Sequence, residues 1–303
     1  MATLPDILVL AAGGVLGEAW MSGVLAGMED ASGLDFRGVE TFVGTSAGSI
    51  VCAHLAGGGR PRRPRGAEAG GDPGFVEDVP ERSAAGGFVR NAARLAATPI
   101  ATPALTLGAA GGALVRRAAL AAVPDGTRDL GHLRREIARS GVRFDGRLRV
   151  CAVDRGSGRR VVFGAPGAPP ADVADAVAAS CSIPGVFRPV RIGGRAYVDG
   201  GAWSLTNLDA APAGRGTEVL CLHPSGSLGA ATSSVWGAVR AAAALAAEVE
   251  ALALRGRGAR VRIVGPDRNA AAIMGTNLMD PRPAGRAHAA GYRQGREAFP
   301  PDP

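Results

Sequence analysis

The sequence predicts an α/β fold in which helices flank a largely parallel sheet. Two strand–loop–helix units lie within the first sixty residues, and a helix is the usual crossover between parallel strands. Hydrophobic residues make up 47% of the chain and charged residues 20%, which is enough apolar material for a buried core. No fixed-period repeat is present. We therefore expect a single domain over residues 1–303.

The first two strands are short, and each ends at glycine. Residues 7–11 form a continuous apolar run, which is typical of a strand buried on both faces. Gly13 and Gly14 end this run, because glycine clusters interrupt regular structure. Apolar residues at helical spacing then predict a helix over 18–28. The second unit has a strand over 39–43, a turn at Gly44 and a helix over 47–55.

A predicted insertion over residues 58–128 separates these units from the rest of the sheet. Its first part is a basic loop rich in glycine and proline, and the arginines in it are Arg60, Arg62, Arg63 and Arg65. This loop has two interpretations: a solvated flexible linker, or a peripheral contact with the headgroups of an anionic membrane. Residues 87–123 regain apolar helical patterning. Because Pro99, Pro103 and Gly111-Gly112 interrupt the pattern, we expect short helices that form a cap or lid.

The sheet continues beyond the insertion. Turn residues at 156–158 separate two apolar runs and predict an antiparallel hairpin. The expected elements are a helix over 129–140, hairpin strands over 148–153 and 160–163, a helix over 171–180, strands near Val190 and over 196–198, a strand over 218–222, a helix over 234–254, a strand over 261–264 and a last helix from about Ala284.

The net charge, the N-terminal sequence and the length of the apolar runs limit the possible functions. The net charge of +7 comes from 34 basic residues, all of them arginine. Aromatic residues are not interleaved with arginine clusters and no nucleic-acid-binding motif is present, so nucleic acid is not an expected partner. The N-terminus lacks the basic start of a secretory signal, and no run of about 18 apolar residues is available to cross a bilayer. We expect a cytoplasmic protein.

Cysteine and histidine are scattered along the chain. The cysteines lie far apart in apolar sequence, which is typical of buried free thiols. The histidines form no pair with the spacing of a metal site. We therefore expect neither a metal nor a cofactor. The residues are Cys52, Cys151, Cys181, Cys221, His54, His132, His223 and His288.

The sharpest local signal is the G-x-S-x-G sequence at 44–48, between a predicted strand and a predicted helix. In that context Ser46 lies on a sharp, strained turn that exposes its hydroxyl, and Gly44 and Gly48 let the strand and the helix approach each other. Ser46 would also stand at a helix N-terminus, whose partial positive charge favours an alkoxide. These residues predict a nucleophile, with a glycine-rich turn capped by a serine as the alternative.

A nucleophile that attacks an acyl group needs donors for the oxyanion that forms. The loop with Gly13, Gly14 and Gly17 follows the neighbouring strand, and its backbone amides can point at one place because no side chains obstruct them. Dinucleotide binding is the alternative, since Ala12, Gly14 and Gly17 imitate part of a G-x-G-x-x-G fingerprint. The first glycine of that fingerprint is absent, as is the acidic residue expected after the second strand.

A third candidate is Asp199, which follows the strand at 196–198 and precedes Gly200 and Gly201. We expect its carboxylate to project over the carboxyl edge of the sheet, where parallel sheets bind ligands. An aspartate in an ordinary turn is the alternative interpretation.

These three blocks, in this order along the chain, resemble the patatin-like phospholipase family. The segment 178–189 (AASCSIPGVFRP), which leads to Asp199, also looks like that family, and residues 274–292 look like its bacterial members. The resemblance covers most of the chain except about 58–128. The glycine loop departs from the family pattern, because Ala12 and Leu16 replace a glycine and a basic residue. Leu16 removes a charge that could hold the loop or meet an anionic substrate, so phospholipid preference is a weaker expectation than hydrolysis.

The resemblance implies a three-layer α/β/α fold and a lipid acyl hydrolase of the phospholipase A or lysophospholipase type. In that family a serine–aspartate dyad forms an acyl-enzyme without histidine. Carried over by position, Ser46 is the nucleophile, Asp199 is the base, and the amides of Gly13, Gly14 and Val15 form the oxyanion hole. The glycines that support these motifs are Gly17, Gly44, Gly48, Gly200 and Gly201.

Two other functions stay open at this point. A Ser-His-Asp esterase would use His223, and the chain order Ser46, Asp199, His223 permits it. Against this esterase, only two predicted strands precede the turn at Ser46 and no HGGG-type loop is present. The other function is that of a catalytically inactive binding protein on the same fold.

Overall fold

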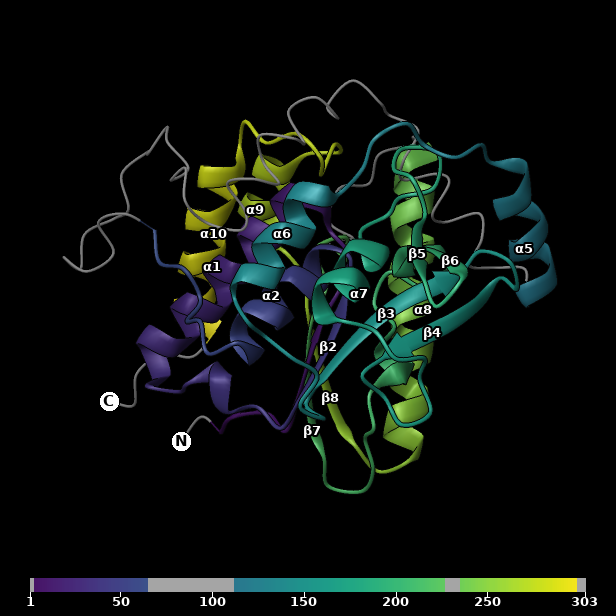
Figure 1. The fold of residues 1–303 in the computed structure, drawn as a ribbon. Coiled ribbons are helices and arrows are strands. Elements are labelled where there is room, and N and C mark those ends of the chain that lie inside the picture. The colour runs from purple at the N-terminus through teal and green to yellow at the C-terminus, as the bar shows by residue number, and fades with distance from the viewer. Residues whose placement is uncertain (1–2, 65–111, 227–234, 299–303) are drawn as a thin grey trace.

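Eight strands form one mixed sheet in the part of the chain that the computed structural model describes, namely residues 3–64, 112–226 and 235–298 (Figure 1). Neighbouring strands are hydrogen-bonded in the order β5-β6-β3-β2-β1-β7-β8, and β4 also pairs with β3. The pairs among β3, β2, β1, β7 and β8 are parallel, whereas β4, β5 and β6 pair antiparallel. The strands are β1 (Ile7–Leu10), β2 (Thr41–Thr45), β3 (Leu148–Asp154), β4 (Arg159–Phe163), β5 (Val190–Ile192), β6 (Arg195–Asp199), β7 (Glu218–Leu222) and β8 (Arg260–Val264).

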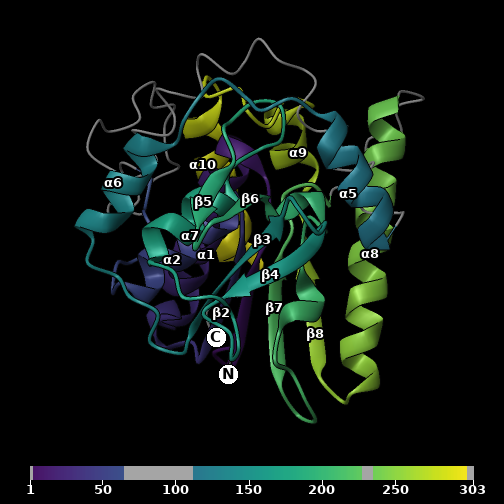
Figure 2. The ribbon, with the colours of Figure 1, turned by 45° about the vertical axis from the view of Figure 1, so that its right-hand side comes forward.

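Helices cover both faces of this sheet (Figures 1 and 2). The group around α1, α2 and α10 lies on one face, and the long helix α8 lies on the other. The helices are α1 (Gly14–Ser32), α2 (Ala47–Ala56), α5 (Gly112–Ala122), α6 (Gly131–Arg139), α7 (Val173–Ser180), α8 (Val235–Gly256), α9 (Arg268–Met274) and α10 (Ala284–Ala298). Short 3-10 turns are η1 (Phe36–Gly38), η3 (Gly200–Ala202) and η4 (Leu208–Ala210).

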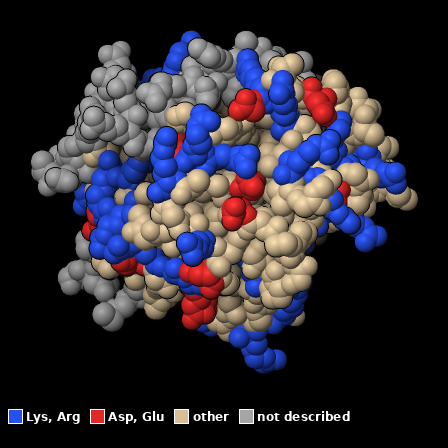
Figure 3. Space-filling model, viewed as in Figure 1, with Lys and Arg blue, Asp and Glu red and all other residues tan. Residues whose placement is uncertain are grey.

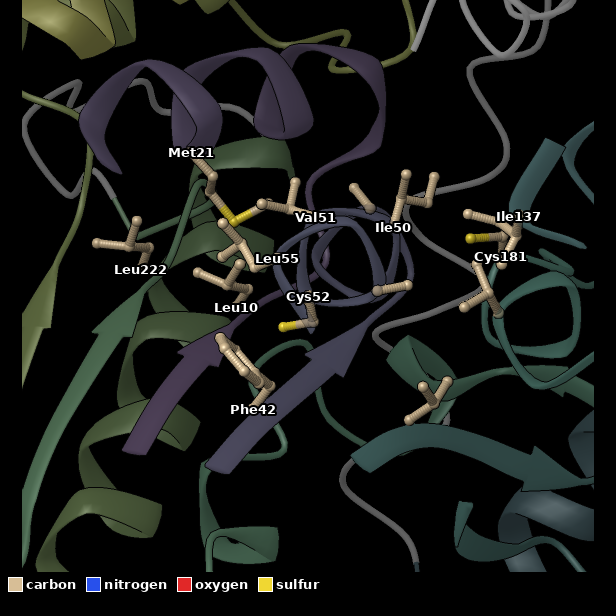
Figure 4. Close-up of a cluster of buried hydrophobic side chains, with 14 of the residues drawn as sticks. Leu10, Met21, Phe42, Ile50, Val51, Cys52, Leu55, Ile137, Cys181 and Leu222 are labelled. Atoms are coloured by element: carbon tan, nitrogen blue, oxygen red, sulfur yellow. The ribbon is translucent and has the colours of Figure 1, made fainter. Parts of the chain in front are cut away.

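Alternating side chains along the central strands produce two separate cores. Leu8 and Leu10 of β1 belong to the larger core, which they share with side chains of α1 and α2 (Figure 4). Val9 belongs to the smaller core, where Ala251 and Leu254 of α8 pack. Because successive residues of a strand face opposite sides, one continuous apolar strand supplies both cores. The expected three-layer α/β/α arrangement with a mainly parallel sheet is therefore confirmed.

Strand β3 brings two strand ends together. On one edge of β3, β4 pairs along Val150–Asp154. The other edge is shared: β2 pairs along Leu148–Cys151 and β6 along Ala152–Asp154, and the two run in opposite directions. The carboxyl ends of β2 and β6 therefore meet beside the junction of Cys151 and Ala152.

Three elements differ from the sequence expectation. Strand β2 covers Thr41–Thr45 and not 39–43, so Gly44 lies within the strand and the turn follows at Ser46. Helix α1 begins at Gly14, not near residue 18, because the glycine loop itself forms the first turn and the Gly17 amide donates to the Gly13 carbonyl at 2.9 Å. Helix α9 was not predicted, although Asp267 caps it by accepting a hydrogen bond from the Ala270 amide at 2.7 Å. Most of the expected insertion over 58–128 lies outside the described residues, since only 58–64 and 112–128 are described.

The described part of the basic loop lies against α1. Its ion pairs are Arg60 with Asp35 at 3.8 Å, Arg62 with Glu18 at 3.1 Å, and Arg63 with Asp30 at 2.6 Å and Glu29 at 3.2 Å. A buried carboxylate such as Glu18 needs a cation as its partner. The ion pairs therefore hold residues 60–63 against the protein, and this part of the chain is not a solvated linker. Arg65 lies outside the described residues. Figure 3 shows arginines interspersed with acidic side chains over the visible face. This face does not by itself indicate a membrane contact, which stays a prediction.

Candidate active site

Ser46 lies on a sharp turn between β2 and α2. Its φ of 51° and ψ of −122° belong to a region that non-glycine residues rarely occupy, at a cost of about 1–3 kcal/mol. The turn is held by Ser180, whose Oγ accepts a hydrogen bond from the Ser46 amide at 2.8 Å and donates one to the Cys151 carbonyl at 2.6 Å. Ser46 occupies the N-cap position of α2, yet its side chain makes no capping hydrogen bond. The hydroxyl is therefore not used as a helix cap.

Two glycines let α2 approach the sheet at this turn. A Cβ atom at Gly48 would lie 1.9 Å from the carbonyl oxygen of Leu10, and one at Gly44 would lie 2.5 Å from the Cα atom of Ser49. Neither distance is sterically possible, so both positions require glycine. The contact at Gly48 also places the end of β1 beside the Ser46 turn.

We expect Gly48→Ala to destabilise the protein, because the added methyl group would overlap the Leu10 carbonyl and force the backbone apart. The melting temperature should fall by roughly 5 °C or more when followed by circular dichroism. Gly214→Ala is the matched control, since nothing lies within 4 Å of a Cβ atom there. If Gly48→Ala and Gly214→Ala had the same melting temperature, the close contact between Gly48 and Leu10 would be contradicted.

Asp199 is the last residue of β6 and is 0% exposed. Its amide donates to the Ser182 carbonyl at 2.9 Å, and its Oδ1 accepts from the Gly201 amide at 2.7 Å. Its Oδ2 has no hydrogen-bond partner within the described ranges. The strands that carry Ser46 and Asp199 end beside each other on β3, and the Ser46 hydroxyl lowers the pKa of this carboxyl group. The structure thus brings the two side chains predicted from the sequence into one place.

Burial has the largest effect on the Asp199 carboxyl and raises its pKa from 3.8 to about 7. The Gly201 amide and the Ser46 hydroxyl act in the opposite direction by favouring the ionised form. A carboxylate with a pKa near neutrality is a much stronger base than an ordinary aspartate. The site therefore offers a hydroxyl next to a group that can take its proton at physiological pH.

The chain that follows Asp199 runs directly against the Ser46 turn. A Cβ atom at Gly200 would lie 2.3 Å from the Cys151 carbonyl oxygen and 3.1 Å from Cγ2 of Thr45. Only glycine permits this close approach. β6 is antiparallel to β3, so Asp199 does not project from a parallel strand as expected, but reaches the carboxyl end of β2 from the opposite direction.

The glycine loop lies between the Ser46 turn and the segment that follows Asp199. Leu10, the last residue of β1, is in register with Gly44, which places the loop after β1 next to the Ser46 turn. The Ala12 amide donates to the Leu205 carbonyl at 2.8 Å, which ties the loop to the segment that follows Asp199.

The loop leaves backbone donors available. The amides of Gly13, Gly14 and Val15 donate to no other group in the described part of the chain, whereas the Leu16 amide donates to the Leu278 carbonyl at 3.0 Å. The first amides of a helix have no partner within the helix, so they can bind an anion. The arrangement suits the predicted oxyanion hole, whose role stays a prediction.

His223 is buried at the end of β7, which lies beyond β1 from the Ser46 turn. Burial alone lowers its pKa to about 4, and its Nε2 atom has no hydrogen-bond partner among the residues described. A triad histidine needs a carboxylate that holds its other ring nitrogen. Among the described residues no carboxylate influences the pKa of His223, which does not favour the Ser-His-Asp alternative.

Sequence reasoning missed two residues that hold the site. Ser180 lies within the segment 178–189 quoted for the family resemblance, but no local pattern shows that it supports the Ser46 amide. Asn207 is 0% exposed and has no motif of its own. Both act through contacts with distant parts of the chain, which spacing along the sequence does not reveal.

The described residues offer neither a metal-binding cluster nor a membrane-spanning helix. Within residues 3–64, 112–226 and 235–298, no cluster of three or more His, Cys, Asp and Glu side chains is arranged to bind a metal ion. None of the described helices combines the length and the apolar composition of a bilayer-spanning segment.

Comparison with known proteins gives one family. The family model described as Patatin-like phospholipase matches residues 8–212, a range that includes Ser46 and Asp199. No curated protein shows significant similarity to the chain. VipD from Legionella pneumophila, a solved structure, has 17% identity and a TM-score of 0.44, and the match covers 98% of this chain and 67% of VipD. The type III effector protein ExoU has 16% identity and a TM-score of 0.38, covering 97% of this chain and 53% of ExoU, so the chain spans about half of that protein.

Proposed function

The chain belongs to the patatin-like phospholipase family and is an ester hydrolase of lipids, and we propose that Ser46 and Asp199 are its catalytic dyad. One observation carries the proposal. Ser46 stands on a strained turn with its hydroxyl uncommitted to the helix, beside a buried carboxyl group whose Oδ2 has no hydrogen-bond partner in the described residues. Strained backbone and unpaired buried polar atoms are uncommon, and both favour a reactive site here.

The reaction begins with proton transfer. As the Ser46 Oγ attacks the acyl carbonyl carbon, its proton passes to the Asp199 carboxylate. The carbonyl oxygen becomes an oxyanion, which the amides of Gly13, Gly14 and Val15 stabilise. The positive end of the α2 dipole also favours the Ser46 alkoxide as it develops. The carbon–oxygen bond to the leaving alcohol then breaks, and the alcohol takes the proton from Asp199.

The second half of the reaction returns the enzyme to its starting state. A water molecule attacks the acyl carbon of the Ser46 ester while Asp199 accepts a proton from that water. The same amides stabilise the second oxyanion. Collapse of the intermediate releases the carboxylic acid and restores the Ser46 hydroxyl, with its proton supplied by Asp199.

The rate of hydrolysis is expected to depend on pH through Asp199. Only the ionised carboxylate can accept the Ser46 proton, and burial raises its pKa to about 7. The value of kcat/KM should therefore rise as pH increases through about 7 and fall on the acid side. Initial rates with a p-nitrophenyl ester between pH 5 and 9 measure this profile. A rate that stays level down to pH 5 would contradict the assignment of Asp199 as the base.

A substrate panel tests the activity itself. Purified protein is mixed with phospholipids, lysophospholipids, acylglycerols and short-chain esters, and fatty-acid release is measured for each. We expect release from at least one class. No release from any class would favour a catalytically inactive binding protein.

Location and membrane contact are further parts of the proposal. A cytoplasmic protein could reach lipid by peripheral contact with an anionic membrane surface. Ion pairing of Arg60, Arg62 and Arg63 with acidic side chains reduces the charge that they can offer to such a surface. Co-sedimentation with liposomes tests this contact. Binding to anionic but not to neutral liposomes would support an electrostatic contact, and equal binding to both or to neither would contradict it.

A further inference from the structure

A buried amide spans the gap between the two catalytic segments. The side-chain nitrogen Nδ2 of Asn207 donates to Oγ1 of Thr45 at 3.1 Å and to the carbonyl oxygen of Gly200 at 3.3 Å. It also donates to the carbonyl of Ser204 at 2.6 Å. Thr45 directly precedes Ser46, and Gly200 directly follows Asp199. One side chain is therefore in contact with the residue next to the nucleophile and the residue next to the base.

The contacts fix the orientation of this amide. Backbone carbonyl oxygens can only accept hydrogen bonds, so the two carbonyls require the nitrogen of Asn207 on their side. On the opposite side, Oδ1 accepts from Nη1 of Arg160 at 3.2 Å. Arg160 is held in turn by the Asp209 carboxylate, to which its Nη2 donates at 2.9 Å. All hydrogen-bonding atoms of the amide thus have partners.

The backbone of Asn207 is also specialised. Its φ is 47° and its ψ is 35°, in the left-handed region that asparagine tolerates better than most residues. Its own amide donates to Oγ of Ser204 at 3.1 Å. An asparagine here satisfies both the backbone conformation and the side-chain contacts.

The sheet joins the two catalytic segments only through β3. β2 and β6 share one edge of β3 and meet end to end, so no ladder of hydrogen bonds connects them to each other. The distance between Ser46 and Asp199 then depends on the pairing of both strands with β3 and on groups that cross the junction between the strand ends. Asn207 is such a group, and it is 0% exposed.

We propose that Asn207 is a positioning residue that sets the separation between Ser46 and Asp199 by binding Thr45 and Gly200. This inference rests on the proposed dyad. Because a misplacement of about 1 Å can reduce a rate about 10²-fold, loss of the amide should lower kcat by roughly that factor. KM should change little, since Asn207 is 0% exposed and its side-chain hydrogen-bonding groups are occupied by other residues of the chain.

Two variants separate the amide from the backbone role. Asn207→Gly keeps the left-handed conformation and removes the amide, whereas Asn207→Asp keeps the size and replaces the donor by an acceptor facing two carbonyls. Both are expected to lose about 10²-fold in kcat per active site, with KM within a few fold of wild type. Active sites are counted by titration with a fluorophosphonate, and kcat is measured with a p-nitrophenyl ester.

Thr45→Val tests the same contact from the other side. Thr45→Val should lower kcat. In the double variant with Asn207→Gly, kcat should fall by much less than the product of the two single reductions, because both changes remove the same hydrogen bond between Asn207 and Thr45. This variant also decides the matter if the Asn207 variants do not fold. Thr45→Val with wild-type kcat, or independent losses in the double variant, would overturn the proposal.

A stability control distinguishes positioning from a general loss of structure. Leu254→Ala removes a buried side chain of α8 in the smaller core and should lower the melting temperature without changing kcat per titrated site. Asn207 variants that behave in this way would have only a structural role, and the inference would fail. If wild-type protein is not labelled at Ser46, the proposed dyad fails instead, so the two failures are distinguishable.

Discussion

Replacing Asp199 by asparagine is expected to reduce hydrolysis of a p-nitrophenyl ester by about 10³-fold or more in kcat. The amide has nearly the same shape as the carboxylate, but it cannot accept the Ser46 proton at accessible pH. Loss of the base in other serine hydrolases has effects of this size. Steady-state rates per folded molecule measure the change. Asp199→Asn protein with more than a tenth of wild-type activity would show that another group is the base.

Stability measurements show whether this variant still folds. The folded-state pKa of Asp199 is about 7, above the value of about 3.9 in an unfolded chain, so folding favours the protonated form. That contribution is complete below about pH 4 and is lost as pH rises through about 7. Asparagine avoids the cost of the buried charge. Asp199→Asn should therefore melt at the same temperature as wild type or above it at pH 8, with the advantage absent at pH 4.

His223→Ala is the matched comparison for the rival mechanism. Both residues are buried, but no carboxylate in the described part of the chain influences the pKa of His223, and we expect its removal to leave kcat within a few fold. If His223→Ala is the inactive variant and Asp199→Asn is not, the serine–aspartate dyad is wrong and the Ser-His-Asp alternative is favoured.

Replacing Ser46 by alanine has the second large expected effect. Without the hydroxyl no acyl-enzyme can form, so kcat should fall by about 10⁴-fold or more. Alanine keeps the Cβ atom of serine, so the strain of the turn at φ 51° is unchanged and the variant should fold with nearly wild-type stability, which makes unfolding a poor explanation for the loss. Activity is measured with the same ester, and folding by thermal denaturation.

Ser140→Ala is the control for Ser46→Ala. The hydroxyl of Ser140 donates to the Ile137 carbonyl at the end of α6 and takes no part in the site. This variant should retain wild-type activity. Residual hydrolysis by Ser46→Ala at more than a few percent of wild type would mean that another nucleophile operates.

The sequence was sufficient to predict the segments that form the site, because each carries a local pattern. G-x-S-x-G between a strand and a helix indicates a strained turn, and Ser46 has that conformation. The glycines near 13 and 200 indicate close backbone approaches, and Gly200 lies against Cys151 and Thr45.

The sequence was not sufficient to predict how Asp199 reaches Ser46. We expected a carboxylate at the edge of a parallel sheet, whereas β6 is antiparallel and shares an edge of β3 with β2. Strand pairing depends on contacts between segments that are distant in sequence, such as Thr45 with Cys151 and Ala152 with Asp199. The supporting contacts of Ser180 and Asn207 were missed for the same reason.

The ion pairs of the basic loop were also beyond local reasoning. A run of arginine, glycine and proline is typical of a solvated segment, and nothing nearby in the sequence shows a partner. The buried acids that bind Arg62 and Arg63 lie on α1, more than thirty residues earlier. A charge on a predicted helix is therefore a weak guide to which distant cation it binds.

The most direct measurement of the central claim is the rate at which a fluorophosphonate forms an adduct on Ser46, followed by intact-mass spectrometry and peptide mapping. We predict one adduct per chain, located on Ser46, that forms quickly in wild type and at least tenfold more slowly in Asp199→Asn. An adduct on another residue, no adduct, or equal rates in the two proteins would contradict the account.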